Sequence, residues 1–218
     1  MTDATPSLFV LSKLADTQVR RLLVMVHGYT GDENSMWIFS RAVSSPTHLI
    51  APRALYPLQN GGYSWVKAKD TYETSHVEDF IHPADVLMKN IDHWIITNTP
   101  QVNEIDLMGF SQGAALSYIM GLKFPHRFRK IACLSGYFPE DRESLFSKPV
   151  RTETRYFIAH GKNDNIVPAR MSREAFDILQ RQDILVEYAE DDSGHKLGVE
   201  NFQALKKFFD GPIYLEPE

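Results

Sequence analysis

The stretch EIDLMGFSQGAALSYIM contains a serine between two glycines, at the point where a strand pattern changes into a helix pattern. Its first five residues are mostly apolar and predict a buried strand, and residues 112–124 predict a helix. A side chain that projects from so sharp a turn strains the backbone, so small residues must flank it. Gly109 and Gly113 meet this need as structural supports, which makes Ser111 a candidate nucleophile. The simpler alternative is a Gly/Ser turn that leads into a helix.

The alternation of short apolar runs and longer helical stretches continues on both sides of this unit. The predicted strands are 8–11, 21–26, 48–51, 105–108, 130–134, 156–159 and 184–188. The predicted helices are 33–43, 77–97, 112–124, 168–182 and 197–209, and Pro83 is expected to start or kink the second. Because most strand runs are apolar throughout, they predict a mostly parallel α/β sheet of about seven strands, covered by helices on both faces. Ligands bind such sheets at the carboxyl ends of the strands.

A nucleophilic serine needs a base, and the base needs an acid that orients it. Among the eight histidines, His195 lies in a loop between the last predicted strand and the last predicted helix. Asp164 lies in the loop that follows the strand 156–159. The chain order Ser111, Asp164, His195 is the order of an α/β-hydrolase triad. Taken singly, Asp164 is also compatible with a capping residue and His195 with a solvated loop histidine.

The strand 21–26 leads directly into a second glycine-containing loop. An ester hydrolase needs two N–H donors for the oxyanion of its tetrahedral intermediate. One is expected from the backbone of Gln112, the residue after the nucleophile, and the other from the backbone of Tyr29. His27 and Gly28 are interpreted as structural supports that shape this loop, and a plain tight turn is the alternative. His160, which also precedes a glycine, is interpreted in the same way.

Together these segments resemble the phospholipase/carboxylesterase family, a group of compact α/β-hydrolases that includes acyl-protein thioesterases and bacterial carboxylesterases. The segments that carry the resemblance are VHGYTGDE (26–33), GGYSW (61–65), GFSQG (109–113), LSGY (134–137), HGKNDNIVP (160–168) and GH (194–195). The resemblance extends from about residue 20 to about residue 210. It implies a short α/β-hydrolase sheet without a large cap domain. It also implies hydrolysis of carboxylic esters, sometimes thioesters or lysophospholipids, without a metal or organic cofactor.

The sequence departs from the family pattern in two places. Lys162 stands where the family often has an aspartate, which changes the local charge. Tyr29 and Thr30 replace the Leu-Gly of the eukaryotic thioesterases. The second departure weighs against specificity for lipidated proteins and favours the bacterial carboxylesterase branch.

The walls of a substrate pocket are expected on the same rim of loops. Six apolar residues are candidates: Trp65, Tyr137, Phe138, Ile166, Val167 and Leu197. Each of them is equally compatible with a place in the core. Little chain is left for a lid between the third and fourth predicted strands, so short or medium acyl chains are expected.

Composition excludes several other classes of protein. The chain has 218 residues, which we interpret as a single domain over 1–218, and its net charge of −5 argues against nucleic acid as a partner. One cysteine, Cys133, excludes an internal disulfide and a zinc site built from cysteines. No H-E-x-x-H pattern occurs, so no metal is expected. The sequence shows neither a secretory signal nor an apolar run long enough to span a bilayer. We therefore expect a cytoplasmic protein with no stable membrane insertion.

These observations predict a serine hydrolase that cleaves a small-molecule carboxylic ester through an acyl-enzyme. Two alternatives stay open. One is a thioesterase or lysophospholipase that uses the same site. The other is a non-catalytic protein that binds a ligand in the same fold. A homodimer is compatible with the family resemblance, but no interface patch is evident in the sequence.

Overall fold

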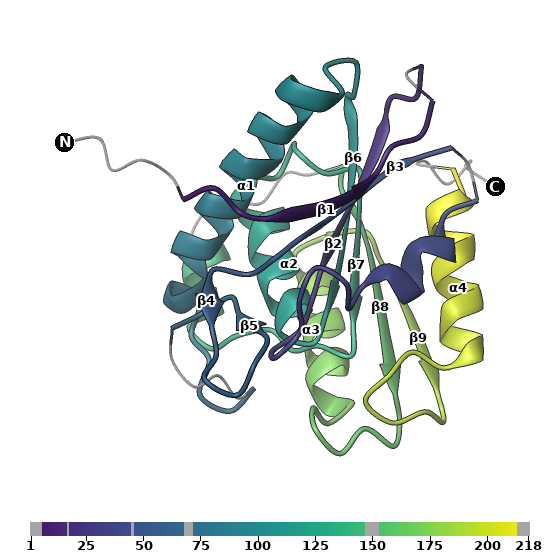
Figure 1. Cartoon of the computed structure of the whole chain (residues 1–218). Coiled ribbons are helices and arrows are strands. Elements are labelled where there is room, and N and C mark those ends of the chain that lie inside the picture. Colours follow the sequence, from purple (N-terminus) through teal and green to yellow (C-terminus); the bar gives the residue numbers. More distant parts are fainter. Residues whose placement is uncertain (1–5, 17, 45, 68–71, 147–152, 213–218) are drawn as a thin grey trace.

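A computed structural model describes residues 6–212 apart from 17, 45, 68–71 and 147–152. Within the described residues, seven strands form one sheet in the order β1-β3-β2-β6-β7-β8-β9 (Figure 1). They are β1 Val10–Lys13, β2 Arg21–Val26, β3 His48–Pro52, β6 Glu104–Phe110, β7 Lys130–Leu134, β8 Arg155–Gly161 and β9 Val186–Asp191. The edge strand β1 runs antiparallel to β3, and all the other neighbours pair in parallel. The predicted mostly parallel sheet is confirmed.

The inner strands are buried on both faces, as their continuous apolar sequence requires. Every residue of β2, β3, β7 and β8 is buried. The strand register aligns the carboxyl ends of neighbouring strands: Val26 pairs with Gly109 and Phe110 pairs with Leu134. The loops that follow β2, β6 and β7 therefore leave the sheet side by side.

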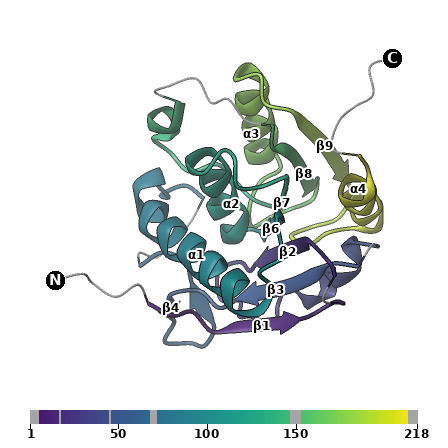
Figure 2. The same ribbon diagram turned by 90° about the horizontal axis from the view of Figure 1, so that it is seen from above.

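Helices cover both faces of the sheet, which gives a three-layer α/β fold (Figure 2). One face carries α1 (Val77–Asn98), α2 (Gln112–Lys123) and α3 (Arg170–Arg181), and the other carries the 3₁₀ helix η1 (Trp37–Ala42) and α4 (Val199–Asp210). A second 3₁₀ helix, η2, covers Arg142–Phe146. This is the compact α/β-hydrolase fold that the sequence predicted.

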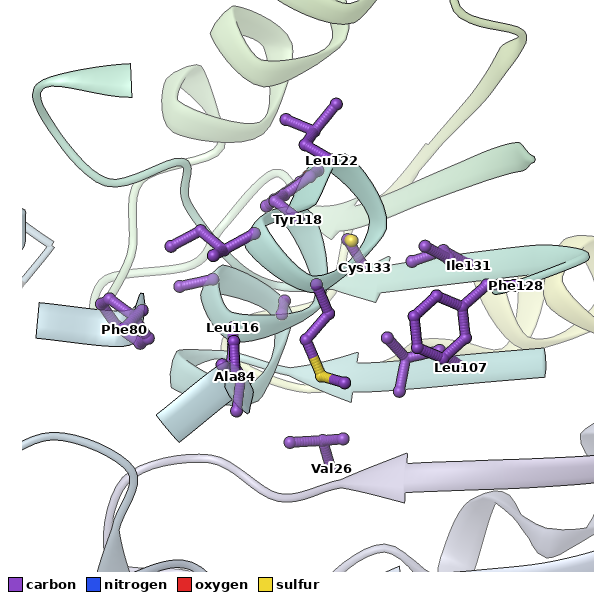
Figure 3. Close-up of a cluster of buried hydrophobic side chains, with 14 of the residues drawn as sticks. Val26, Phe80, Ala84, Leu107, Leu116, Tyr118, Leu122, Phe128, Ile131 and Cys133 are labelled. Carbon is purple, nitrogen blue, oxygen red and sulfur yellow. The ribbon is translucent and has the colours of Figure 1, made fainter. Parts of the chain in front are cut away.

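The larger hydrophobic core lies between the sheet and the layer of α1, α2 and α3. Figure 3 shows part of it, where Tyr118 of α2 lies beside Cys133 of β7, and Phe80 of α1 lies on the Leu116 side of α2. Eleven consecutive residues of α2, from Gln112 to Leu122, are buried. The helix that follows Ser111 is therefore packed against protein on every face, and this packing fixes the position of its N-terminus.

Three local features differ from the sequence prediction. The predicted helix over 33–43 is the six-residue 3₁₀ helix η1. Pro83 lies inside α1 and is buried, so it does not start that helix. A short hairpin of β4 (Tyr56–Pro57) and β5 (Tyr63–Ser64) was not predicted. The predicted domain limits, residues 1 and 218, lie outside the described residues. Among the described residues, no helix is both long enough and apolar enough to cross a membrane.

Candidate active site

Ser111 sits at the sharp turn between β6 and α2 with a strained backbone. Its φ of 54° and ψ of −116° lie in a region that non-glycine residues rarely adopt. The flanking glycines allow this turn because the chain is crowded there. A Cβ on Gly109 would lie 2.1 Å from the Gly113 carbonyl oxygen, and a Cβ on Gly113 would lie 2.2 Å from the Val26 carbonyl oxygen. The turn therefore requires glycine on both sides of the serine.

His195 bridges Ser111 and Asp164 across the carboxyl edge of the sheet. Its Nε2 lies 3.1 Å from the Ser111 Oγ, and its Nδ1 lies 2.7 Å from the Asp164 Oδ2. Because a carboxylate only accepts hydrogen bonds, Nδ1 carries the proton and Nε2 is left to accept the serine proton. The Asp164 side chain is fully buried, and that of His195 is 20% exposed. The predicted serine, aspartate and histidine are brought into one hydrogen-bonded chain.

The Asp164 carboxylate is held by its own loop. Its Oδ1 accepts the backbone N–H groups of Ile166 and Val167, each at 2.9 Å. The buried His160 ring donates from Nε2 to the Val167 carbonyl oxygen at 2.8 Å, and this nitrogen lies 3.1 Å from the Asp164 Oδ2. Burial lowers the pKa of His160, so the ring stays neutral beside the acid. Sequence reasoning gave His160 a loop-shaping role but missed its contact with Asp164.

The loop that carries His195 is hydrogen-bonded to the loop that carries Asp164. The Asn163 side chain donates to the Asp192 carbonyl oxygen at 2.7 Å, and the Asn163 backbone N–H donates to the Ser193 carbonyl oxygen at 3.0 Å. A Cβ on Gly161 would lie 2.3 Å from that Ser193 oxygen. The base and its acid are thus positioned by two adjacent loops in close backbone contact.

The two residues predicted to stabilise an oxyanion flank Ser111. Gln112 is the first residue of α2, where the helix dipole favours negative charge. The loop of Tyr29 reaches the same place, because a Cβ on Gly28 would lie 3.2 Å from the Ser111 Cβ. In the part of the chain that the structure describes, the Tyr29 backbone N–H has no hydrogen-bond partner. It is therefore free to bind a ligand oxygen.

His27 supports this loop as a buried neutral ring. The Ala54 backbone N–H donates to the His27 Nε2 at 3.0 Å, so the ring proton is on Nδ1 and is donated to the Gly28 carbonyl oxygen at 2.7 Å. Burial lowers the pKa of His27. The ring has no free nitrogen for proton transfer, which agrees with a structural role.

A cavity of about 610 Å³ opens beside Ser111 and His195. Its lining comes from the loop after β2, from the segment around η1 and from the His195 loop. The lining residues are Gly28, Tyr29, Thr30, Gly31, Ser35, Met36, Ile38, Phe39, Phe110, Ser111, His195, Lys196 and Leu197. The apolar members of this set make the cavity suitable for a hydrocarbon group.

The predicted pocket walls correspond only in part to this lining. Leu197 lines the cavity. Trp65, Tyr137, Phe138 and Val167 do not, because they are at most 3% exposed and belong to the core. Ile166 is 59% exposed and lies outside the lining as well. A role of these five residues in binding substrate therefore stays a prediction that this cavity does not support.

Sequence reasoning also missed Met36, Phe39 and Phe110 as lining residues. The sequence contained a hint of this role. Two of these residues are apolar residues of the segment 33–43, and the third directly precedes Ser111. That segment was assigned to a covering helix, and its position next to the nucleophile follows only from the sheet order.

Comparison with known proteins identifies the group to which this arrangement belongs. A family model described as Phospholipase/Carboxylesterase matches residues 9–212. This chain belongs to that family. An acyl-protein thioesterase 1 from Kluyveromyces lactis is 25% identical, over 90% of this chain and 93% of the relative. The corresponding protein of Debaryomyces hansenii is 26% identical, over 73% of this chain and 76% of the relative.

Solved structures of esterases share the fold of this family member. The crystal structure of esterase PE8 superposes with a TM-score of 0.81 at 23% identity, over 93% of this chain and 98% of the other. The Bacillus cereus carboxylesterase gives a TM-score of 0.77 at 19% identity, with 93% of each chain covered. The family assignment makes the protein a hydrolase of the esterase and thioesterase kind. The sequence preference for the bacterial branch stays a prediction.

Proposed function

We propose that this protein is a serine hydrolase that cleaves carboxylic esters, with Ser111 as nucleophile, His195 as general base and Asp164 as the orienting acid. One observation carries the proposal: a continuous chain of hydrogen bonds runs from the Ser111 Oγ through the His195 ring to the Asp164 carboxylate. This chain joins a strained serine to a base whose tautomer is already suited to accept its proton.

In the first half of the reaction, the Ser111 Oγ attacks the ester carbonyl carbon while the His195 Nε2 takes the serine proton. Asp164 stabilises the imidazolium that forms but does not itself become protonated. The carbonyl oxygen becomes an oxyanion, and the backbone N–H groups of Tyr29 and Gln112 donate hydrogen bonds to it. When the tetrahedral intermediate collapses, His195 returns the proton to the departing alcohol, and the acyl group stays on Ser111.

In the second half, water replaces the alcohol. The His195 Nε2 takes a proton from the water as the water oxygen attacks the acyl carbon of the ester on Ser111. The same two amides stabilise the second oxyanion. Collapse of this intermediate releases the carboxylic acid and returns the proton to the Ser111 Oγ, so the enzyme is restored.

Short or medium acyl esters suit this site best. The cavity of about 610 Å³ beside Ser111 has an apolar lining that includes Met36, Phe39 and Leu197. It is open to solvent at one side, where Ile38 is 73% exposed. Rates measured with p-nitrophenyl esters from acetate to palmitate test this preference. A maximum at short or medium chains is expected, and a clear maximum at palmitate would contradict it.

Thioester hydrolysis is the second candidate function. The observation that favours it is the similarity to acyl-protein thioesterase 1 of two yeasts. The same triad chemistry applies to both substrates, because only the leaving atom differs. Rates on a matched pair, an acyl ester and an acyl thioester of the same chain length, decide between them.

The proposal is tested with Ser111→Ala. The variant keeps the fold but lacks the nucleophile, so hydrolysis of p-nitrophenyl acetate should fall to the level of buffer catalysis. A fluorophosphonate should label the wild-type protein and leave the variant unlabelled. Ser117→Ala, which removes a hydroxyl bonded to the Gly113 carbonyl oxygen inside α2, is the matched control. Near wild-type turnover by Ser111→Ala would refute the assignment, and no turnover by the wild type would support a non-catalytic ligand-binding protein.

A further inference from the structure

Trp65 is a fully buried residue that donates hydrogen bonds to both segments next to Ser111. Its backbone N–H donates to the Gln112 Oε1 at 2.9 Å, and its indole Nε1 donates to the His27 carbonyl oxygen at 2.9 Å. Gln112 follows Ser111, and His27 precedes Gly28 and Tyr29. One residue therefore links the two segments whose amides form the oxyanion hole of the proposed mechanism.

The Gln112 side of this link is rigid. The Gln112 Nε2 donates to the Ser64 Oγ at 3.1 Å, and the Ser64 Oγ donates to the Val66 carbonyl oxygen at 2.8 Å. Ser64 and Gln112 are each 1% exposed. Since water does not compete for these bonds, the Gln112 side chain holds the backbone of Trp65 in one position.

The His27 side is equally constrained. Both ring nitrogens of His27 are hydrogen-bonded to backbone, and its ring centroid lies 5.4 Å from that of Trp65. A Cβ on Gly113 would lie 2.6 Å from the His27 carbonyl oxygen that accepts the indole N–H. The N-terminus of α2 and the loop after β2 are thus in close contact, and the hydrogen bond from the Trp65 indole to the His27 carbonyl oxygen holds the position of that loop.

We propose that Trp65 is a positioning residue that sets the spacing between the Tyr29 and Gln112 amides. The proposal rests on the function proposed above. Oxyanion donors act at about 2.7–3.1 Å from the oxygen, and a displacement of about 1 Å costs roughly 100-fold in rate. Because the oxyanion exists only in the transition state and the intermediates, misplaced amides lower kcat and leave KM nearly unchanged. A residue of the pocket wall would change KM instead.

The test is Trp65→Phe, which keeps an aromatic ring and removes the indole N–H. We expect kcat for p-nitrophenyl butyrate to fall roughly 10- to 100-fold with KM within about twofold of wild type. The affinity for a trifluoromethyl ketone, which binds as a tetrahedral adduct, should fall by the same factor. Trp94→Phe is the matched control, because it makes the same change on α1, outside the cavity lining. It should change neither quantity.

A second variant keeps the proposal testable if Trp65→Phe does not fold. Ser64→Ala removes the hydroxyl that holds the Gln112 side chain and creates little empty space. It should lower kcat several-fold with KM retained. The proposal is overturned if Trp65→Phe matches Trp94→Phe, if its effect is confined to KM, or if Ser64→Ala leaves kcat unchanged. Failure of the proposed function itself is distinct, because the wild-type protein would then not be labelled by a fluorophosphonate at Ser111.

Discussion

At the scale of single residues, a substitution of Asp164 tests whether this residue takes part in catalysis or only caps its own loop. Its Oδ1 accepts two backbone N–H groups of its own loop, as a capping aspartate would, and its Oδ2 contacts His195. Asp164→Asn keeps the shape and the Oδ1 contacts but can stabilise neither the imidazolium nor the required tautomer. We expect kcat to fall by roughly 10³- to 10⁴-fold while the fold is retained. Kinetics together with a thermal melt check this. A folded variant with wild-type kcat would show that Asp164 only caps its loop and has no part in catalysis.

Buried neutral histidines predict how stability depends on pH. Burial lowers the pKa of His27 and of His160 below the ordinary 6.5. Below pH 6.5, the unfolded chain therefore binds protons that the folded chain does not. The free energy of unfolding should fall with falling pH from about 6.5 to the lower folded-state pKa, by up to roughly 1.4 kcal/mol per pH unit for each ring.

Urea unfolding of wild type and His27→Gln between pH 7.5 and 5.5 measures this dependence. The variant should show a shallower slope than wild type, because it lacks one of the two rings whose pKa burial lowers. His93→Gln, which changes an exposed histidine of α1, should keep the wild-type slope. Identical slopes for all three proteins would mean that His27 takes up a proton in the folded state.

The sequence predicted that the serine, the aspartate and the histidine lie together, because each follows a strand in a parallel sheet. The same reasoning did not anticipate how deeply most of the predicted pocket walls are buried. Trp65 and Tyr137 also lie near strand ends, but burial depends on what packs above a loop, and the sequence does not contain that information. The link from Trp65 to Gln112 joins residues 47 positions apart, so no local pattern predicts it.

At the scale of elements, the contact between α2 and the loop after β2 depends on Gly113. A Cβ there would lie 2.2 Å from the Val26 carbonyl oxygen and 2.6 Å from that of His27, and backbone atoms cannot yield as a side chain can. Gly113→Ala should therefore cost about 1–3 kcal/mol of stability or more.

The matched control for this variant is Gly194→Ala, whose Cβ would have its nearest neighbour at 3.7 Å, an ordinary contact. Urea unfolding of both variants gives the comparison. A Gly113→Ala protein as stable as Gly194→Ala would show that α2 is free to shift away from β2, against the close packing described for the site.

Elements with strong periodicity were predicted closely, and short ones were not. Helix α1 begins at Val77 as predicted and ends one residue later than predicted. The segment 33–43 contains apolar residues at helical spacing but forms only η1, and backbone bonds such as that from the Phe39 N–H to the Met36 carbonyl oxygen span three residues, as in a 3₁₀ helix. The two-residue strands β4 and β5 are too short to leave a pattern.

At the scale of the whole molecule, a buried charge cluster joins the sheet to the last helix. The fully buried Asp106 of β6 accepts from Arg21 at 2.6 Å and from Arg129 at 2.9 and 2.6 Å. Arg21 also donates to the Phe209 carbonyl oxygen of α4 at 3.0 Å. Removing the aspartate charge takes away the buried carboxylate that both guanidinium groups share, although Arg129 keeps an ion pair with Glu104 at 3.6 Å. Asp106→Asn should therefore destabilise the protein by about 3–5 kcal/mol.

The control for this prediction is Asp92→Asn, which breaks an ion pair with Arg127 whose two side chains are each about 40% exposed. Such surface pairs contribute roughly 0–1 kcal/mol. Chemical denaturation compares the variants, and ester hydrolysis of Asp106→Asn under native conditions should stay at the wild-type level. Equal, small losses of stability for both variants would contradict this account of the cluster.

The fold class was accessible from sequence because seven apolar runs and four of the helices recur in a regular α/β order. The homodimer and the single domain over 1–218 stay predictions. What the structure adds is the juxtaposition of loops: Ser111, Asp164 and His195 follow β6, β8 and β9 and meet only because the sheet order places those strands near one another.

The most direct test of the central claim is mass spectrometry of the protein quenched in acid during turnover of p-nitrophenyl acetate. The proposed acyl-enzyme predicts one added acetyl group, located on the peptide that contains Ser111 and absent from Ser111→Ala. Continued turnover with the acetyl group on another residue, or with no covalent adduct under conditions where deacylation limits the rate, would contradict the account.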